Sequence, residues 1–364
     1  MRVAAGSKYG MRLNDSHSGV TLRGEGRDSI IKQAGGHSGS NRVIYIDADT
    51  NPEDITIRDL RIDGNRANNA YRTTIGILAW PSSRTKNILV ENVWVENCSE
   101  TGITLATGDI TVRRCTAAHN GRHGINPDTA NPDSTIRVEN VLSHHNDVYG
   151  IDDSCGDTVI DGFVIHDCTY GMKHTADTER SVVKNGRIRD CGTNGYATVI
   201  PNSGWPSPRP NITIDNVLSE GNERWGFRFD ENADYDVGTI EARENNSDGR
   251  AAQIGVFNDC AITADEVYSY DAESGTGFHF ATGQDGSIAT FCHAGNPDGG
   301  VSQYNADGDL NIGEQVAKRV SNVSVPTADE VGAGSLSTSE ETPPTAAKSV
   351  GGVIETKNGT LQTW

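Results

Sequence analysis

A glycine followed by a large apolar residue recurs along most of this 364-residue chain. From 76 to 226 the spacings are 21–31 residues, and the glycines are Gly76, Gly102, Gly124, Gly150, Gly171, Gly195 and Gly226, with a further one at Gly277. Starts of short apolar strands give a similar period, at Ile88, Ile110, Ile136, Thr158, Ser181, Ile212, Val237 and Ile262. Each unit reads as strand, turn, strand without helical periodicity. The repeat therefore predicts an all-β solenoid, a parallel β-helix of about ten coils.

The first 35 residues contain the run GVTLRGEGRDSIIKQ, a strand, a glycine-rich turn and a second strand. This run resembles the first coil of the pectate-lyase-like β-helix superfamily. The resemblance implies a single-stranded right-handed parallel β-helix solenoid with a C-terminal extension.

Composition fits a narrow solenoid and points to an acidic surface. The chain has 41 Gly and only 6% aromatic residues, which suits a core filled by aliphatic side chains. The net charge is −19, and 8 of the 31 basic residues are Lys, leaving 23 Arg. Such a surface resembles that of proteins from extreme halophiles, in which salt screens self-repulsion. It argues against nucleic acid as a partner.

Seven cysteines are present, without regular spacing and without a CxxC pair. An odd number so placed is neither a disulfide framework nor a zinc site. We expect small buried hydrophobes in the core, with Cys98 and Cys191 in equivalent places of their coils.

The chain divides by pattern into three parts. We expect a parallel β-helix over 1–300, a capping segment over 301–325 with a short helix in EQVAKRV, and a linker with a small attachment segment over 326–364. The last part ends in VIETKNGTLQTW, which predicts a β-hairpin turned at Asn358-Gly359. It resembles the attachment pieces of virus tail-spike chains.

No metal or cofactor is expected. Asp307, Asp309 and Asn311 alternate like the oxygen ligands of a calcium loop, but the glycine comes one place late, at Gly313, and no Glu completes the pattern. A polar turn is the better interpretation there, with Ca²⁺ as the alternative.

The sequence shows no transmembrane run, and its first fifteen residues lack the apolar core of a signal peptide. We expect no membrane insertion. The expected location is extracellular or on a virion surface, and the expected partners are a polysaccharide or cell-surface glycan and, in the second case, a homotrimer or other virion proteins.

Positions that repeat in neighbouring coils stack at roughly 4.8 Å and form ladders. One residue before each glycine lie Thr101, His123, Tyr149, Tyr170, Asn194, Trp225 and Thr276. Two residues after it lie Thr104, Asn126, Asp152, Lys173, Ala197, Arg228 and His279. The apolar residue after the glycine should point inward, so the residue beyond it should point outward. If the glycine permits a bend, both ladders flank one outer groove. Aromatic rings at coil spacing suit the C–H faces of an extended glycan, while a hydrophobic corner and a solvated salt-bridge ladder are the structural alternatives.

Two segments carry a further resemblance. Tyr149-Gly150-Ile151-Asp152 resembles the start of the Tyr-Gly-Phe-Asp-Pro-His motif of β-helical mannuronan C5-epimerases, and His123-Gly124-Ile125-Asn126-Pro127 resembles an altered copy. The similarity spans about 60 residues. It implies that Tyr149 and Asp152 hold matching roles, with Tyr and His exchanging the C5 proton and Asp and basic side chains holding the uronate carboxylate. The motif's His is Ser154 in one register and Asp128 in the other, so His123 or His174 would have to supply the imidazole.

These residues define the candidate site. The proposed catalytic groups are His123, Tyr149, Asp152 and Lys173, and the proposed substrate-binding groups are Asn126, Asp128, Tyr170, His174, Trp225 and Arg228. Proton abstraction beside a carboxylate needs a base, an acid and a cation, which this set contains. A glycoside hydrolase would instead use two carboxylates from Asp128, Asp152 and Asp153. A polysaccharide lyase or epimerase, a hydrolase, a non-catalytic tail spike or adhesin, and a purely structural solenoid all remain open.

Two sets of turn residues are interpreted as structural. His119, His144, His145 and His166 are expected on turns, facing solvent and without metal spacing. Asn120, Asn146 and Asn222, with Asp167 in the same slot, are expected to form a turn ladder that satisfies backbone groups.

Overall fold

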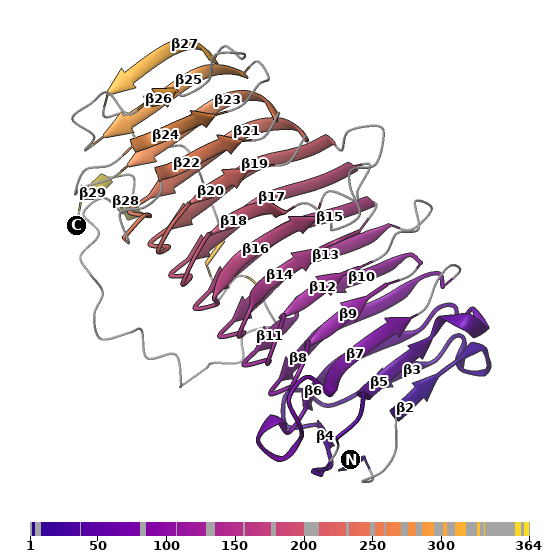
Figure 1. The fold of residues 1–364 in the computed structure, drawn as a ribbon. Coiled ribbons are helices and arrows are strands. Elements are labelled where there is room, and N and C mark those ends of the chain that lie inside the picture. The colour runs from indigo at the N-terminus through magenta and orange to yellow at the C-terminus, as the bar shows by residue number, and fades with distance from the viewer. Residues whose placement is uncertain are drawn as a thin grey trace. The chain divides into compact units, whose positions relative to one another are not determined.

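The computed structural model describes residues 2–3, 9–36, 38–80, 85–106, 108–128, 135–155, 157–175, 180–199, 211–230, 233–247, 252–257, 260–270, 276–281, 286–294, 301–303, 310–317, 326–327, 331, 354–357 and 360–363. Contacts divide the chain into two units, 1–334 and 335–364. The first is a solenoid whose strands stack one coil upon the next (Figure 1). No helix among the described residues is long and apolar enough to cross a membrane.

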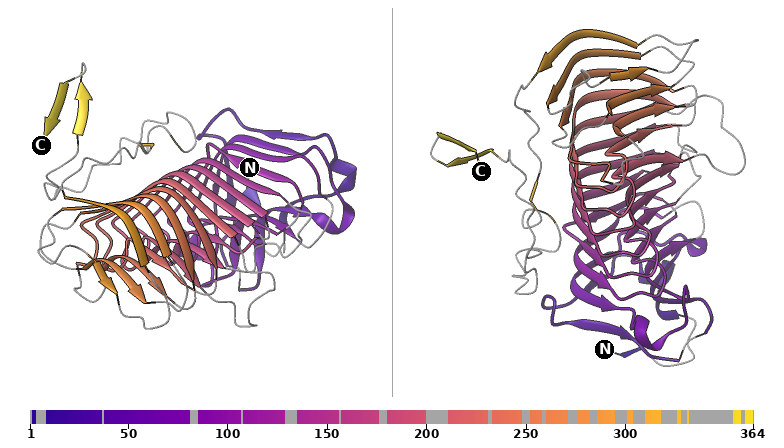
Figure 2. Two further views of the ribbon diagram at one scale, coloured as in Figure 1. Left: turned by 90° about the horizontal axis from the view of Figure 1, so that it is seen from above. Right: turned by 60° about the vertical axis from the view of Figure 1, so that its left-hand side comes forward.

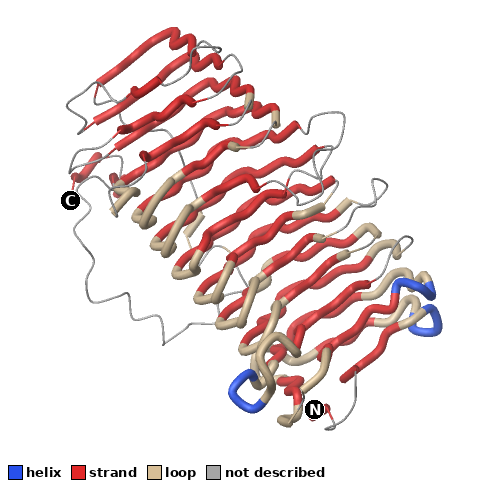
Figure 3. Tube along the Cα trace, in the orientation of Figure 1, coloured by secondary structure: helices blue, strands red, loops and turns tan. Residues whose placement is uncertain are grey.

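Two parallel sheets run the length of the solenoid (Figures 2 and 3). We call the 15-stranded sheet A, and its strands are β1 (Arg2–Val3), β3 (Thr21–Arg23), β4 (Ile30–Gln33), β6 (Thr56–Asp63), β8 (Ile88–Glu96), β10 (Ile110–Arg113), β11 (Thr116–Ala118), β13 (Ile136–His144), β15 (Asp157–His166), β17 (Arg180–Arg189), β19 (Asn211–Glu220), β21 (Asp234–Arg243), β23 (Ala261–Tyr270), β25 (Gly286–Ala294) and β27 (Leu310–Ala317).

We call the 12-stranded sheet B, and its strands are β2 (Tyr9–Leu13), β5 (Asn41–Asp47), β7 (Thr74–Trp80), β9 (Ile103–Leu105), β12 (Ile125–Pro127), β14 (Tyr149–Asp153), β16 (Tyr170–Thr175), β18 (Tyr196–Val199), β20 (Phe227–Phe229), β22 (Ala252–Phe257), β24 (Thr276–Ala281) and β26 (Val301–Gln303). Twelve strands in this sheet slightly exceed the ten or so coils expected. Three short 3₁₀ turns are η1 (Asp15–His17), η2 (Ala48–Thr50) and η3 (Arg66–Asn68).

The glycine repeat aligns the coils as predicted. The residue after each glycine is buried and stands in one column across sheet B, formed by Ile77, Ile103, Ile125, Ile151, Met172, Tyr196, Phe227 and Phe278, with Ile254, which follows Gln253, between the last two. Burial of each such side chain stabilises the fold by about 1.5–3 kcal/mol. Close packing explains the glycine itself, because a Cβ on Gly150 would lie 2.3 Å from Cγ2 of Ile165.

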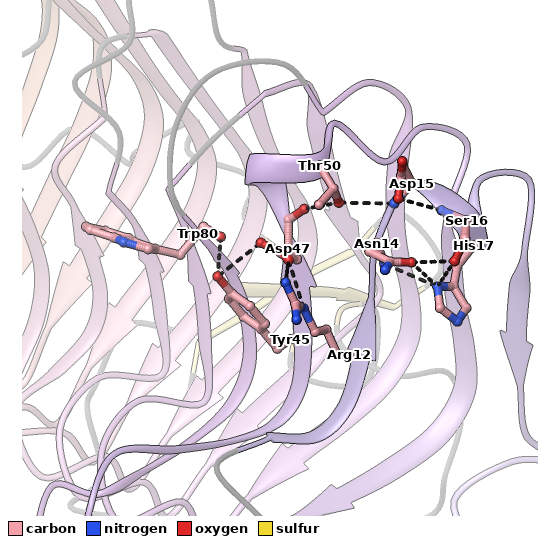
Figure 4. A network of polar contacts seen from close by, with 9 residues as sticks. All are labelled: Arg12, Asn14, Asp15, Ser16, His17, Tyr45, Asp47, Thr50 and Trp80. Atoms are coloured by element: carbon pink, nitrogen blue, oxygen red, sulfur yellow. Dashed lines mark hydrogen bonds and ion pairs between the residues drawn. The ribbon is translucent and has the colours of Figure 1, made fainter.

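The first coils of sheet B are joined by a polar network (Figure 4). Arg12 Nε donates to Asp47 Oδ2 at 2.8 Å, and Thr50 Oγ1 donates to the Asp47 carbonyl oxygen at 2.9 Å. The Tyr45 hydroxyl donates to the carbonyl oxygen of Trp80 at 2.8 Å. The network therefore links β2, β5 and β7, where the solenoid begins.

The C-terminal part differs from expectation in one element. The short helix expected in EQVAKRV is not present over Glu314–Ala317, which belong to β27 and pair in parallel with β25; residues 318–325 lie outside the described residues. An open strand edge offers a hydrogen-bond partner for every backbone group, and that outweighs the weak helix preference of a short segment. Beyond β27, Val331 is buried against Leu142 and Val164 of sheet A.

The second unit contains β28 (Ile354–Lys357) and β29 (Thr360–Thr363), paired antiparallel as the expected hairpin requires. Its turn at Asn358-Gly359 lies outside the described residues, as do Asp307 and Asp309 of the calcium alternative. Asn311, the third residue of that alternative, lies on β27 and is exposed.

Candidate ligand-binding groove

The ladder two residues after each glycine forms a continuous outward column on sheet B. Register pairs join Asp152 to Lys173, Lys173 to Ala197 and Ala197 to Arg228. The column then continues through Gly255 to His279. On the N-terminal side, Asn126 pairs with Thr104 and its side-chain amide donates to the backbone oxygen of Asp152 at 2.8 Å.

The ladder before each glycine lies beside this column on the same face. His123 Nε2 is 3.2 Å from Asp152 Oδ2, and Lys173 Nζ lies 5.6 Å from the ring centre of Tyr149. Each contact joins a member of one ladder to a member of the other. These contacts agree with the expectation of one shared face, and we call the outward surface along this column, from β12 through β14, β16 and β18 to β20, the groove.

Aromatic rings stack along the groove. The His123 and Tyr149 rings are stacked at 5.3 Å, and the Tyr149 and Tyr170 rings lie 4.9 Å apart. These separations follow from the coil spacing, which brings one ring per coil into contact with the next. Tyr149 and Tyr170 are half-buried, and His123, beside Tyr149 in the neighbouring coil, is buried. The groove thus presents two phenol rings to solvent, followed along the same row by a buried imidazole.

Burial and charge shift the pKa values of three groups in opposite senses. Burial, followed by Arg122, Lys173 and Arg72, lowers the pKa of His123 to about 2. Burial also raises the pKa of Tyr149 to about 12 and raises that of Asp152, against which Lys173 acts. At neutral pH His123 is a neutral imidazole and Tyr149 a protonated phenol.

Cations on this face lie in front of buried carboxylates. Lys173 Nζ is 3.0 Å from Asp152 Oδ1, with the two side chains 18% and 8% exposed. Two coils further, Arg228 donates from Nε to Asp230 Oδ2 at 2.9 Å, and these side chains are 41% and 1% exposed. In each pair the carboxylate orients the basic side chain, and the basic side chain faces outward.

Trp225 and Arg228 lie together, but two coils from Lys173. The Trp225 ring meets that of Phe257 at 5.0 Å, and the Arg228 guanidinium is 5.3 Å from the Phe257 ring centre. His279 completes this group, 5.3 Å from Phe257 between ring centres. The proposed site residues therefore form two clusters on one column, with Ala197 between them.

His174 was wrongly assigned to the groove. Its side chain is 0% exposed, and its Nδ1 lies 3.0 Å from Oδ2 of the equally buried Asp153. Asp153 also accepts from the Thr158 and Ser181 hydroxyls at 3.0 and 3.2 Å. Since neighbouring residues of a strand face opposite sides, Lys173 and Asp152 point outward while His174 and Asp153 point into the solenoid.

The same alternation weakens the hydrolase alternative. Asp152 and Asp153 are consecutive on β14 and face opposite sides, so they cannot flank one glycosidic bond. Asp128 is half-buried just beyond β12, where its backbone N–H donates to the Leu105 oxygen at 2.7 Å.

The turn histidines only partly follow expectation. His119 and His145 are exposed, but His144 and His166 are buried. Burial, together with His166, His145 and His119, lowers the pKa of His144 to about 2. His144 and His166 are the last residues of β13 and β15 and are register partners in neighbouring coils. A prediction that places them on turns does not reveal this packing.

The asparagine ladder is confirmed, with one change of slot. Asn120 Oδ1 accepts from the Cys98 N–H at 3.0 Å, and Asn146 Oδ1 accepts from the Asn120 N–H at 3.1 Å. Cys168 then occupies the next position, in contact with the Asn146 amide at 3.9 Å. Asp167 therefore does not belong to this ladder, because it follows β15 as His145 follows β13.

Sequence reasoning missed Arg122 and the carboxylates behind the cations. Arg122 immediately precedes His123, is partly exposed, and lies 3.5 Å from Glu100 Oε1. It influences the pKa values of His123, Asp152 and Tyr149. Its position next to a ladder residue was the available signal, whereas the pairing of Arg228 with Asp230 required the fold.

Comparison with known proteins agrees with the architecture. The family model "Right handed beta helix region" matches residues 106–267. The A-module of mannuronan C-5 epimerase AlgE6 from Azotobacter vinelandii aligns with a TM-score of 0.65 at 20% identity, over 87% of this chain and 88% of that one. The AlgE4 A-module from the same organism gives 0.63 at 18% identity, over 90% and 88%.

Tailspike protein 2 of bacteriophage CBA120 aligns at 15% identity over 83% of this chain and 47% of that one, with a TM-score of 0.48, too low to support a functional parallel. A search of curated proteins finds no match. At these identities the matches establish the fold.

Proposed function

We propose that the groove of this right-handed parallel β-helix binds an acidic polysaccharide, most simply a polyuronate. The observation that carries the proposal is that basic side chains face outward, each paired with a buried carboxylate. Lys173 and Arg228 lie on one column, about 10 Å apart over two coil spacings. An extended chain of sugar units can place successive carboxylates along such a column.

The charge pairs favour an anionic ligand in spite of the acidic net charge of −19. Asp152 and Asp230 are almost completely buried, so a ligand meets the ammonium and guanidinium groups first. Arg228 keeps N–H donors beyond the two that bind Asp230, and a guanidinium fork suits a carboxylate. Local charge rather than net charge then decides the contact.

The aromatic rings supply the second half of the binding surface. Tyr149 and Tyr170 present phenol rings within one coil spacing of Lys173. Sugar C–H faces stack on such rings, and the hydroxyls hydrogen-bond to the glycan. Two structural neighbours are named as mannuronan epimerases, which supports a polyuronate as the first ligand to test.

A second candidate function is proton transfer at a uronate, as in an epimerase or lyase. The favouring observation is a neutral His123 in stacking contact with a protonated Tyr149. The imidazole would accept the C5 proton while the electron pair moves onto the carboxylate, held by Lys173. Tyr149 would then protonate C5 from the other face, giving epimerisation. If instead the C4–O bond breaks, Tyr149 would protonate the departing oxygen, giving an unsaturated uronate.

This second function requires a rearrangement of the groove. Both His123 nitrogens are buried and make no hydrogen bond to the described residues. A substrate reaches them only after a movement of the groove that exposes the imidazole. The non-catalytic alternative, an adhesin or tail spike, uses the same groove without this movement, and an extracellular or virion-surface location and a homotrimer belong to that proposal.

Calorimetric titration of the full chain in high salt tests the binding proposal. The ligands are a polyuronate and the same polymer after reduction of its carboxylates to alcohols. We expect binding of the polyuronate, weaker binding of the reduced polymer, and a marked loss for Tyr170→Ala, with Tyr170→Phe retaining most of the affinity. Equal affinity for both polymers, or none for either, contradicts the proposal.

A parallel incubation in D₂O separates binding from catalysis. Deuterium at C5, followed by NMR, reports epimerisation, and ultraviolet absorbance reports an unsaturated product. Deuterium incorporation or absorbance that Tyr149→Phe abolishes supports the enzyme. Tight binding without either signal assigns a binding role alone.

A further inference from the structure

Four imidazoles from three successive coils form two stacked pairs outside the groove. His119 and His145 follow β11 and β13, and both have left-handed backbone, with φ of 55° and 52°. His144 and His166 are register partners at the ends of β13 and β15. Histidine is one of the few residues enriched at positive φ, and coil spacing then stacks equivalent rings.

The rings are in mutual contact. The His119 and His145 ring centres are 4.9 Å apart, and those of His144 and His166 are 4.9 Å apart and nearly parallel, at 6°. The Nδ1 atoms of His144 and His145 approach to 2.8 Å. One ligand nitrogen from each of His119, His144 and His145 lies within 4.8 Å of the others.

We propose that this cluster is a binding site for one divalent transition-metal ion of the zinc class, with His119, His144 and His145 as ligands. Imidazole nitrogen suits Zn²⁺, Cu²⁺ and Ni²⁺, whereas Mg²⁺ and Ca²⁺ prefer oxygen. Zinc binds histidine nitrogen at about 2.0–2.1 Å. The exposed rings of His119 and His145 can turn toward the buried His144 to reach that distance.

The surroundings favour a cation and suggest a supporting residue. His119 and His145 border a hollow of about 540 Å³, which Asp147, Asp167 and Asp190 also line. Asp147 is paired with Arg66 and Asp190 with Arg189, so Asp167, beside His145 and His166, is the carboxylate that favours a cation at the imidazoles. Asp167 Oδ2 lies 2.6 Å from His166 Nδ1, and the His166 ring stacks on His144, so this pair positions a ligand ring.

A second set of three residues competes for the assignment. His145, His166 and Asp167 also bring one ligand atom each within 4.8 Å of one another. The hydrogen bond between Asp167 and His166 already engages that carboxylate oxygen, whereas the first set has three imidazoles converging. The variants below separate the two sets.

Isothermal titration of the metal-stripped full chain with ZnCl₂, with Co²⁺ absorption as a spectroscopic check, tests the site. The informative variants are His119→Asn and His145→Asn, because asparagine also tolerates positive φ and both side chains are exposed. We expect one equivalent of Zn²⁺ in the parent protein and an affinity loss in each variant of at least the ~10–100-fold that second-shell changes cause. Mg²⁺ should not compete.

Two control variants make the outcome decisive. Asp167→Asn should weaken binding by no more than the ~10–100-fold of a supporting residue, because Asp167 binds His166 and lies 3.9 Å from His145 Nε2 but is not one of the three proposed ligands. His17→Gln, on the distant turn η1, should be unchanged. Equal affinity in His119→Asn and the parent overturns the proposal, as does loss of binding in Asp167→Asn with His119→Asn unaffected. Circular dichroism and melting temperatures confirm that each variant is folded.

Discussion

Lys173 Nζ lies 3.0 Å from Asp152 Oδ1, across the boundary between two coils in which the two residues are direct register partners. The pair combines a buried carboxylate with a lysine ammonium group at the groove surface. Its position explains both the orientation of Lys173 and the presence of a carboxylate that is 8% exposed.

Removal of Lys173 should therefore destabilise the solenoid. Lys173→Ala leaves the Asp152 carboxylate buried without its cation, and an unsatisfied buried charged acceptor costs about 1–3 kcal/mol. Lys184→Ala is the matched control, because Lys184 lies 3.2 Å from Asp161 in a pair that is 41% and 35% exposed. Such a surface pair contributes at most about 1 kcal/mol. Urea unfolding that shows equal losses for both variants would falsify this account of the pair.

Asp153 should matter for stability although it does not face the groove. Asp153→Ala removes the acceptor of the Thr158 and Ser181 hydroxyls and the neighbour of His174, all inside the solenoid. We expect a loss of about 3 kcal/mol or more in the free energy of unfolding. Asp236→Ala, at an exposed position of β21, should change it by less than about 0.5 kcal/mol. A mild effect of Asp153→Ala would show that its interior contacts are not formed.

Acid should destabilise the fold through His123. Its pKa falls on folding from 6.5 to about 2, so between these values the unfolded chain binds a proton that the folded chain does not. Stability therefore decreases as pH drops below 6.5, by up to about 1.4 kcal/mol per pH unit for this group. Urea midpoints of the parent and His123→Gln from pH 7.5 to 4.5 should diverge in slope, the variant being flatter. The raised pKa of Asp152 acts in the opposite sense in both proteins. Parallel slopes contradict the burial of His123.

All seven cysteines should resist thiol reagents in the folded protein. Each is a buried thiol outside any disulfide, and burial raises the pKa of Cys115 and Cys168 to about 12. The thiolate is the reactive form, so both exposure and ionisation are missing. A thiol assay should find no reactive groups under native conditions and seven after unfolding. A stoichiometric reaction of the native protein would place at least one cysteine at the surface.

The glycine repeat predicts the solenoid because each glycine and the apolar residue after it mark one coil. Alternation also directs Asp152 and Lys173 outward, whereas the shared face with His123 and Tyr149, three residues before an outward position, depends on a bend at the glycine. The inward His174 was missed because its buried partner Asp153, which also accepts from the Ser181 hydroxyl, lies in the neighbouring coil and only the fold brings the two together. Polar residues in sequence are assumed to face solvent until a buried partner is known.

Asp167 shows a second limit. Counting back from the glycine places it with Asn146, but that coil is shorter, and register places Cys168 there instead. A shift of one position separates a turn ladder from the histidine cluster. Coil length variation of this kind is set by turn geometry, which spacing does not reveal.

The central claim is that the groove recognises a polyuronate through its outward-facing lysine and arginine side chains. One affinity comparison tests this claim most directly. Arg228 and Arg243 are matched, since each is paired with a buried carboxylate and lies over an aromatic ring, at 5.3 Å from Phe257 and 5.9 Å from Tyr270. Only Arg228 belongs to the groove column, whereas Arg243 ends β21 in sheet A. Calorimetric titration with a polyuronate oligomer should show a loss of about tenfold or more for Arg228→Gln, as expected for a charge-assisted hydrogen bond, and unchanged affinity for Arg243→Gln. Equal affinities for the two variants would contradict the claim.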